Sequence, residues 1–244
     1  MKEYLYSRNA VNEALRAKRR EIFAVEVADS AQEKGRLAEI IQLAREHGIK
    51  VNKAPRAKLD KIHDNHQGVV AEVSGYSYSD VVEILEYASS KNEQPFILIL
   101  DSLQDPQNFG TLLRTAEAIG AHGVVIPLAR TVDVTPAVVN ASSGASEFML
   151  IARANLSQTI DALKDNEIWV AGLDQTGAEM EAGSRHLRGA LGLVVGSEGE
   201  GLHDLIRKKC DILLKLPMKG RVESLNAAVA GSVALYLAYF SRQR

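Results

Sequence analysis

Residues 95–127 read PFILILDSLQDPQNFGTLLRTAEAIGAHGVVIP. One unbroken apolar run covers 95–101, and a second, GVVIP, covers 123–127. Such runs are typical of strands that are covered on both faces of a parallel sheet. Between them, over 107–119, apolar residues recur at the spacing of one helix face, which predicts a helix. The stretch therefore predicts a strand–helix–strand unit of an α/β fold.

The same alternation continues toward the C-terminus. Further apolar runs, each a predicted strand, cover 167–173, 190–196 and 211–217. Predicted helices begin at Thr135–Pro136, extend over 156–164 with Asn155 as N-cap, and extend over 225–240. Strands that alternate with helices form mostly parallel sheets, and ligands bind at the carboxyl ends of the strands. We therefore expect residues 94–244 to form one α/β domain with its site in the loops after the strands.

A shorter α/β unit precedes this domain, over residues 1–74. Its predicted elements are helices at 9–19 and 32–47 and strands at 21–28, 49–52 and 69–73. GYSYSD, residues 75–80, is short and polar and predicts a linker. A connecting helix follows over 80–90, with Asp80 as N-cap and Glu83 three residues on. The sequence thus predicts two domains, 1–74 and 94–244, joined by residues 75–93.

Composition indicates the cellular setting. The chain has 244 residues, of which 46% are hydrophobic, and a formal net charge of −2. Cys210 is the single cysteine, so no intramolecular disulfide can form and a reducing compartment is expected. The N-terminal sequence lacks the apolar stretch of a secretory signal, and no run approaches the roughly 18 apolar residues of a membrane span. We therefore expect a cytoplasmic protein.

Polar residues and glycines follow three of the predicted strands. After the first strand, Asn108 and Gly110 lie at the start of the predicted helix, and Arg114 lies further along it. The loop at 196–201, GSEGEG, has its glycines in the order G-x-x-G-x-G, whereas the dinucleotide fingerprint is G-x-G-x-x-G. The carboxylates of Glu198 and Glu200 would also repel a pyrophosphate bound there. This loop therefore argues against an NAD-linked oxidoreductase. A glycine-rich turn with a carboxylate could instead hold an adenosyl ligand or a cationic one, and a tight strand-to-helix turn without a ligand is the structural alternative.

The third loop, 216–226, lies between the last strand and an apolar helix. Ser224 is a suitable N-cap for that helix, whereas Asn226 is expected inside its first turn, where a polar side chain often faces a ligand. The chain has no HExxH, CxxC or clustered His/Cys spacing for a metal, no GxSxG elbow and no GxxxxGK[ST] phosphate loop. An enzyme with this sequence is expected to work without a metal or a covalent nucleophile, by positioning a reactive cofactor.

Taken in order, these three loops resemble the three signature motifs of the SpoU (TrmH) family, RNA 2′-O-ribose methyltransferases of the SPOUT superfamily. The matching residues are Asn108, Gly110 and Arg114; then Gly196 through Gly201; then Leu216-Pro217-Met218 through Ser224-Leu225-Asn226. The front segment is similar to the family's L30e-like substrate-binding domain at Arg8-Asn9-Ala10-Val11 and His66-Gln67-Gly68-Val69. Ser7 stands where the family usually has glycine.

The resemblance implies a fold, a cofactor and an assembly. The C-terminal part of the catalytic sheet would form a deep trefoil knot, a rare exception to the usual rules of chain threading. The loops of the knot would bind S-adenosyl-L-methionine in a bent form, and two catalytic domains would associate as a homodimer. The cofactor-binding residues would be Gly196, Gly199, Leu216, Met218 and Leu225.

The resemblance also implies roles for the polar residues. Arg114 would hold a phosphate and stabilise oxyanion charge on the attacking ribose oxygen, because an ordinary guanidinium cannot act as a base. A direct base role, which has been proposed for the family, would require an unusual pKa shift. Asn108 and Glu198 would orient Arg114 and the substrate, and Ser224 and Asn226 would hold the ribose or complete the cofactor loop.

The substrate would be ribosomal RNA bound through the front domain. Residues 1–75 hold 14 Lys/Arg against 11 Asp/Glu, whereas 76–244 hold 15 against 20, so the front part is the better candidate for contacts with phosphates. An ordinary solvated surface explains that charge about as well. The candidate RNA-binding residues are Arg8, Lys18, Arg19, Arg20 and Arg56, and Lys53 and Lys58 could extend them.

Several functions remain open from the sequence. The resemblance favours a guanosine in the peptidyl-transferase region of 23S rRNA as the target. A tRNA or another rRNA nucleotide would require the same chemistry. A ribosome-assembly protein without catalytic activity is a remote alternative, and the joint presence of Asn108, Arg114, Glu198, Ser224 and Asn226 argues against it.

Overall fold

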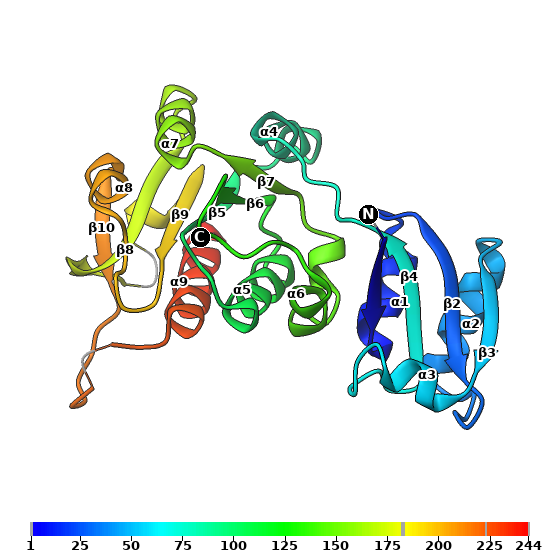
Figure 1. Ribbon diagram of the computed structural model, residues 1–244. Coiled ribbons are helices and arrows are strands. Elements are labelled where there is room, and N and C mark those ends of the chain that lie inside the picture. The colour runs from blue at the N-terminus through cyan, green and yellow to red at the C-terminus, as the bar shows by residue number, and fades with distance from the viewer. Residues whose placement is uncertain (1, 182–183, 223, 244) are drawn as a thin grey trace. The chain divides into compact units, whose positions relative to one another are not determined.

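The computed structural model describes residues 2–181, 184–222 and 224–243 as two compact units (Figure 1). Unit 1 consists of Met1–Ser77 together with Asp133–Phe148, and unit 2 consists of Tyr78–Val132 together with Met149–Arg244. The chain therefore passes from one unit to the other three times. The segment 133–148 lies inside the predicted catalytic domain, 94–244, yet it packs as part of unit 1.

Unit 1 is built on a four-stranded mixed sheet in the order β1-β4-β2-β3. Its strands are β1 (Lys2–Tyr6), β2 (Ile22–Ala28), β3 (Lys50–Ala54) and β4 (Val69–Ser74), and its helices are α1 (Arg8–Ala17), α2 (Arg36–Glu46), α3 (Arg56–Asp60) and α6 (Pro136–Ala141), with a 3₁₀ turn, η1 (Ala145–Glu147). α1 buries Ala10, Val11, Ala14 and Leu15, which recur at helical spacing. It ends at Lys18, whose φ of 54° is left-handed and cannot continue the helix.

A buried ionic cluster, the Arg20 clasp, ties segment 133–148 to the rest of unit 1. We define it as Glu3, Arg20, Tyr76 and Glu147. The Arg20 guanidinium has no exposed surface; its Nε lies 3.0 and 3.1 Å from the two Glu147 carboxylate oxygens, and its Nη1 lies 2.7 Å from Glu3 Oε2. The guanidinium carbon lies 5.1 Å from the centre of the Tyr76 ring. Burial raises the pKa of the Glu147 carboxyl, and Arg20 opposes that rise.

Unit 2 contains a six-stranded sheet in the order β10-β8-β9-β5-β6-β7, and every pair of neighbouring strands in it is parallel. Its strands are β5 (Phe96–Asp101), β6 (Gly123–Pro127), β7 (Ile151–Ala154), β8 (Trp169–Glu179), β9 (Leu191–Gly196) and β10 (Ile212–Lys215). Its helices are α4 (Val81–Ser90), α5 (Pro106–Ala118), α7 (Leu156–Asp165), α8 (Asp204–Lys209) and α9 (Ala227–Arg242), with a 3₁₀ turn, η2 (Arg185–Leu187). The parallel α/β sheet expected from the apolar runs is confirmed.

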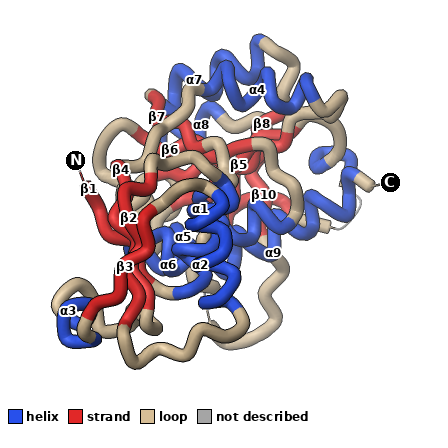
Figure 2. The backbone as a smooth tube through the Cα atoms, turned by 90° about the vertical axis from the view of Figure 1, so that its right-hand side faces the viewer, coloured by secondary structure: helices blue, strands red, loops and turns tan. Residues whose placement is uncertain are grey.

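Helices cover both faces of this sheet. Figure 2 shows α4, α7 and α8 on one side and α5 and α9 on the other. On the first side, Ile84, Ile160 and Ile206 share one core with Ile97 and Val170 of the sheet. Because both faces are covered, the central strands β5 and β9 are buried along their whole length, which is why they are continuously apolar in sequence.

Helix starts agree with the sequence at two places and correct it at a third. Asp80 accepts a hydrogen bond from the Glu83 amide at 2.8 Å, and Asn155 accepts one from Gln158 at 3.2 Å, so both predicted N-caps are confirmed. The last helix was expected over 225–240 with Ser224 as a suitable cap. It instead begins at Ala227 with Asn226 as its N-cap, because the Asn226 side chain accepts from the first free amides of the helix.

Candidate active site

The candidate site lies at the carboxyl ends of two neighbouring strands, β5 and β9. The two strands run parallel and in register to their last residues, where Asp101 is opposite Gly196. Because parallel strands end at the same edge, the loops that follow them emerge side by side. These loops carry the first two groups of residues singled out in the sequence.

Three polar side chains from three loops meet at this edge, and we call them the Asn–Glu–Asn cluster: Asn108, Glu198 and Asn226. Asn108 Nδ2 and Asn226 Nδ2 both donate to Glu198 Oε1. Asn226 Nδ2 also lies 3.1 Å from Asn108 Oδ1, which accepts from it. Glu198 and Asn226 are exposed to solvent, and Asn108 is half-buried. The structure thus brings together three of the five residues to which catalytic roles were assigned.

Helix capping fixes the two asparagines of the cluster. Asp105 precedes α5 and accepts from the Asn108 amide at 3.1 Å, so Asn108 lies in the first turn. Asn226 accepts from the amides of Ala228 at 2.9 Å and Val229 at 3.2 Å through its Oδ1. That contact leaves the Asn226 amide nitrogen facing Glu198. The orientation of Asn226 is therefore determined by two sets of hydrogen bonds at once.

The cluster also depends on the packing of α5 against α9. Thr115 Oγ1 of α5 lies 2.9 Å from Ser232 Oγ of α9. Gly231 of α9 is buried, and a Cβ atom there would lie 2.6 Å from Leu112 Cδ2. Glycine at 231 therefore lets the two helices approach closely. This approach holds their first turns, with Asn108 and Asn226, at hydrogen-bonding distance.

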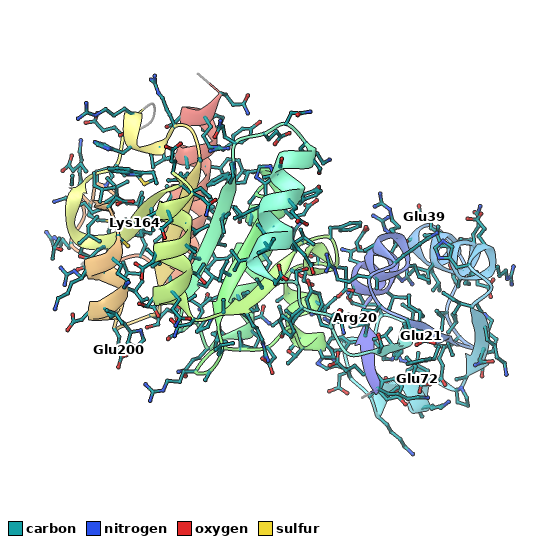
Figure 3. The ribbon with its side chains drawn as sticks, turned by 90° about the horizontal axis from the view of Figure 1, so that it is seen from above. Arg20, Glu21, Glu39, Glu72, Lys164 and Glu200 are labelled. Atoms are coloured by element: carbon teal, nitrogen blue, oxygen red, sulfur yellow. The ribbon has the colours of Figure 1, made fainter. Side chains whose placement is uncertain are left out.

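The loop between β9 and α8 is a tight turn made possible by its glycines. Ser197 and Gly201 exchange two backbone hydrogen bonds, of 3.0 and 3.1 Å. A Cβ at Gly196 would lie 2.2 Å from the Gly201 carbonyl carbon, so a larger residue would break the turn. Gly199 has a φ of 85°, which favours glycine. Glu198 of this loop joins the cluster, whereas the Glu200 side chain points away from unit 2 (Figure 3).

The segment after β10 supplies apolar rather than polar surface. Met218 and Leu225 are 40% and 39% exposed, which is high for large apolar side chains. Leu216 is half-buried, and Ser224 is exposed and precedes α9. Arg114 lies on an exposed position of α5, six residues after Asn108. The roles assigned to Arg114, Ser224, Leu216, Met218 and Leu225 stay predictions.

Of the candidate RNA-binding residues of unit 1, four have side chains that are at least partly exposed, and the fifth, Arg20, is buried. Lys18 and Arg56 are exposed, and Arg8 is partly exposed, with its Nε donating to the Gln67 carbonyl at 3.1 Å. Arg19 donates from Nε to the Glu147 carbonyl at 3.0 Å. Arg20 was expected to contact RNA, and this expectation is corrected: its guanidinium is buried in the clasp with Glu147 and cannot reach a phosphate.

No three or more His, Cys, Asp or Glu side chains among residues 2–181, 184–222 and 224–243 are arranged to hold a metal ion. Within the same ranges, none of the helices combines the length and the apolar character needed to cross a bilayer.

Two family models match this chain. The SpoU rRNA methylase family matches residues 95–236, more than half of the chain. A second model, described as the RNA 2′-O ribose methyltransferase substrate-binding domain, matches residues 4–79. The first match contains the Asn–Glu–Asn cluster, and the second covers nearly all of the four-stranded sheet of unit 1.

Relatives and solved structures agree with these matches. The chain is 44% identical to YacO of Bacillus subtilis, which carries a provisional TrmH family tRNA/rRNA methyltransferase name, over 98% of this chain and 96% of YacO. A Staphylococcus saprophyticus protein with a similar provisional name is 38% identical over 98% of this chain and 95% of its own. The fold matches that of the SpoU methyltransferase AviRb from Streptomyces viridochromogenes, solved with AdoMet, with a TM-score of 0.79 at 22% identity over 98% of this chain and 89% of AviRb. From the family match over 95–236 and the extended identity to YacO, it follows that this chain belongs to the SpoU rRNA methylase family.

Proposed function

We propose that this protein transfers a methyl group from S-adenosyl-L-methionine to a ribose 2′-hydroxyl of RNA. The observation that carries the proposal is the Asn–Glu–Asn cluster: Asn108, Glu198 and Asn226 come from three separate family motifs and meet at one edge of the sheet. AviRb, which shares the fold, was solved with the same cofactor. Family membership and the cluster together support an RNA methyltransferase over a non-catalytic assembly protein.

The chain has surface that fits such a cofactor beside the cluster. Gly196 and Gly201 let the loop fold back on itself at the end of β9, because a side chain at Gly196 would collide with the Gly201 backbone, and we infer that this tight turn presents main-chain groups to the cofactor. Met218 and Leu225 expose apolar surface of the kind that an adenine ring covers. We assign the adenosine to Gly196, Gly199, Leu216, Met218 and Leu225. The bound cofactor would supply a sulfonium methyl group that is already activated for transfer.

The residues of the chain would then position and polarise the ribose oxygen. Arg114 would bind the adjacent phosphate and stabilise the negative charge that develops on the 2′-oxygen as the hydroxyl proton passes to solvent water, since a guanidinium does not itself serve as the base. Asn108 and Glu198 orient Arg114 and the substrate. Ser224 and Asn226 hold the ribose or close the cofactor loop. Rate enhancement would come mainly from alignment of the two reactants.

We place the target in ribosomal RNA and, more finely, at a guanosine in the peptidyl-transferase region of 23S rRNA, as for RlmB. The substrate-binding match over residues 4–79 supports an RNA partner. The names of YacO and its relatives include both tRNA and rRNA, so a tRNA or another rRNA nucleotide is the second candidate. Mapping 2′-O-methylation in rRNA and tRNA of a strain that lacks the protein separates the two.

We further propose the domain roles and the assembly. Residues 1–74 bind RNA, 75–93 link, and 94–244 hold the catalytic site and the trefoil knot of the family. A homodimer would form through the catalytic domain in the cytoplasm. In support, α9 exposes Val229, Val233, Tyr236 and Phe240, which recur at helical spacing on one side of the helix.

Arg114→Ala tests the chemistry directly. The variant should lose methyl transfer to RNA by at least about 100-fold, because it lacks the charge that stabilises the oxyanion. Its affinity for S-adenosylmethionine, measured by calorimetry, should stay within about twofold of the wild type. Arg45→Ala, at an exposed position of α2 in unit 1 and outside the motifs, serves as the matched control. Equal loss of turnover and cofactor affinity in Arg114→Ala would contradict the assigned role.

A further inference from the structure

A buried carboxylate at the end of β5 holds the far side of the glycine loop. Asp101 is the last residue of the strand and is 3% exposed. Its Oδ2 accepts from the His203 backbone amide at 2.8 Å, and its Oδ1 lies 2.9 Å from Nδ1 of the His203 ring. Ser102 Oγ donates to the same Oδ1 at 3.3 Å. One carboxylate therefore holds both the main chain and the side chain of His203.

His203 occupies a position where another residue type would be expected. It is the N-cap of α8, a position that favours Ser, Thr, Asp or Asn. Its side chain makes no capping hydrogen bond and turns to Asp101 instead. Since a carboxylate can only accept, His203 Nδ1 is the donor of this hydrogen bond. The His203 side chain therefore binds the end of β5 and does not cap the helix that follows it.

The contact between Asp101 and His203 restrains the glycine-rich loop at residues 196–203. The loop leaves the sheet at Gly196, directly opposite Asp101, and returns to Asp101 at His203. Between these points lie Gly199 and Gly201, both with positive φ. Glu198, near the tip, is the acceptor of the Asn–Glu–Asn cluster. Asp101 thus lies opposite the residue where the loop begins, and its carboxylate holds the residue where the loop ends.

We propose that Asp101 and His203 form a positioning pair for the methyl-transfer site. The pair sets the conformation of residues 196–203 and, through it, the place of Glu198 and of the backbone at Gly196. Neither residue belongs to the three loop motifs of the cofactor and cluster residues. The inference rests on the proposed function for its effect on methyl transfer, whereas its effect on the loop is independent of that function.

The experiment compares His203→Leu with His203→Asn in the full chain. Asparagine carries an amide N–H close to the place of the Nδ1–H and can keep the bond to Asp101, whereas leucine cannot. Hydrogen–deuterium exchange without ligands should show the Ser197 and Gly201 amides exchanging at least about tenfold faster in His203→Leu and near the wild-type rate in His203→Asn. His47→Leu, at the end of α2 in unit 1, is the matched control and should leave this loop unchanged.

Kinetics then separate positioning from a general loss of stability. His203→Leu should raise the KM for S-adenosylmethionine and lower kcat, so that kcat/KM falls by about tenfold or more. The affinity for RNA should stay unchanged. His203→Asn should restore most of the loss. Asp101→Asn should give a similar defect, and the double variant Asp101→Asn/His203→Leu should be no worse than the more affected single variant.

Unchanged loop exchange in His203→Leu would overturn the proposal, as would equal defects in the leucine and asparagine variants. If the wild type bound no S-adenosylmethionine, the proposed function would fail instead. The exchange comparison would still decide whether Asp101 and His203 fix the loop.

Discussion

Cys210 shows how burial changes the chemistry of a single side chain. It follows α8 and lies against Gly172 of β8, where a Cβ would come within 2.8 Å of its Sγ. Burial raises the pKa of the Cys210 thiol to about 12, and the neighbouring Asp211 adds to the rise. Since the thiolate is the reactive form, Cys210 is expected to be inert in the folded protein.

The corresponding measurement is thiol labelling at pH 8. A pKa near 12 in place of 9 lowers the thiolate fraction about 1,000-fold, so native Cys210 should react with a disulfide reagent at least about 100-fold more slowly than the denatured chain. Rapid labelling of the folded protein would show that the thiol is accessible and ionised. Labelling in denaturant provides the control on the same residue.

The Asn–Glu–Asn cluster and Arg20 show which features of single residues the sequence could and could not predict. Asn108, Glu198 and Asn226 were singled out because their loops match family motifs, and the parallel sheet explains why the loops converge. Their hydrogen bonds join residues up to 118 positions apart, so no local pattern specifies them. Arg20 was misjudged because arginine is normally exposed, and its partner Glu147 is 127 positions away.

Helices and strands were predicted best where their burial requires a regular pattern of apolar residues in the sequence. The buried strands β5, β6 and β9, the first half of β8, and the helices α4, α5 and α7 follow apolar runs, helical periods and caps. The sequence interpretation missed β1, β7, α3 and α8. These four are short, and β1 and β7 are edge strands with mixed composition, so the apolar signal of a covered strand is weak in them.

Gly231 connects helix packing to the site at the scale of elements. In an open helix, alanine in place of glycine stabilises by about 1 kcal/mol. In Gly231→Ala the new Cβ would meet Leu112 of α5 and push α9 outward. We expect the free energy of unfolding to fall by about 1–3 kcal/mol in chemical denaturation. Methyl transfer should fall as well, because Asn226 moves away from Asn108.

A compensating change tests that explanation. Leu112→Val removes a methylene group near position 231, so the double variant Gly231→Ala/Leu112→Val should recover part of the lost stability and activity. Leu112→Val alone should be destabilised by about 1 kcal/mol. Simple addition of the two single effects would mean that the clash with Leu112 is not the cause.

At the scale of the whole molecule, the Arg20 clasp joins distant parts of the chain. Arg20→Met leaves Glu147 buried without its partner, and such changes cost about 3–5 kcal/mol. Burial raises the pKa of Glu147 and Arg20 opposes that rise, so the loss of Arg20 should raise the pKa of Glu147 further in the folded variant. The variant should therefore lose more stability at pH 8 than at pH 5, because a raised carboxyl pKa in the folded state disfavours folding increasingly as the pH rises.

Thermal and urea unfolding at the two pH values measure this effect. Arg20→Met/Glu147→Leu removes both charges and should be much closer to the wild type than Arg20→Met, because no uncompensated charge stays buried. Arg36→Met, which removes an exposed ion pair with Glu39 on α2, is the control and should change stability by less than about 1 kcal/mol. A double variant as unstable as Arg20→Met would contradict this account.

The three crossings of the chain between its units bear on how this protein could evolve or be recombined. A chimera that took residues 1–77 from a relative would import an arginine at position 20 while keeping the host's own 133–148 segment, including its residue at 147. Since we propose that unit 1 binds the RNA, we expect exchange of target preference between members of the family to succeed only when the two stretches travel together or already match. The inheritable unit for this proposed role is thus discontinuous in the gene, although it is a single body in space.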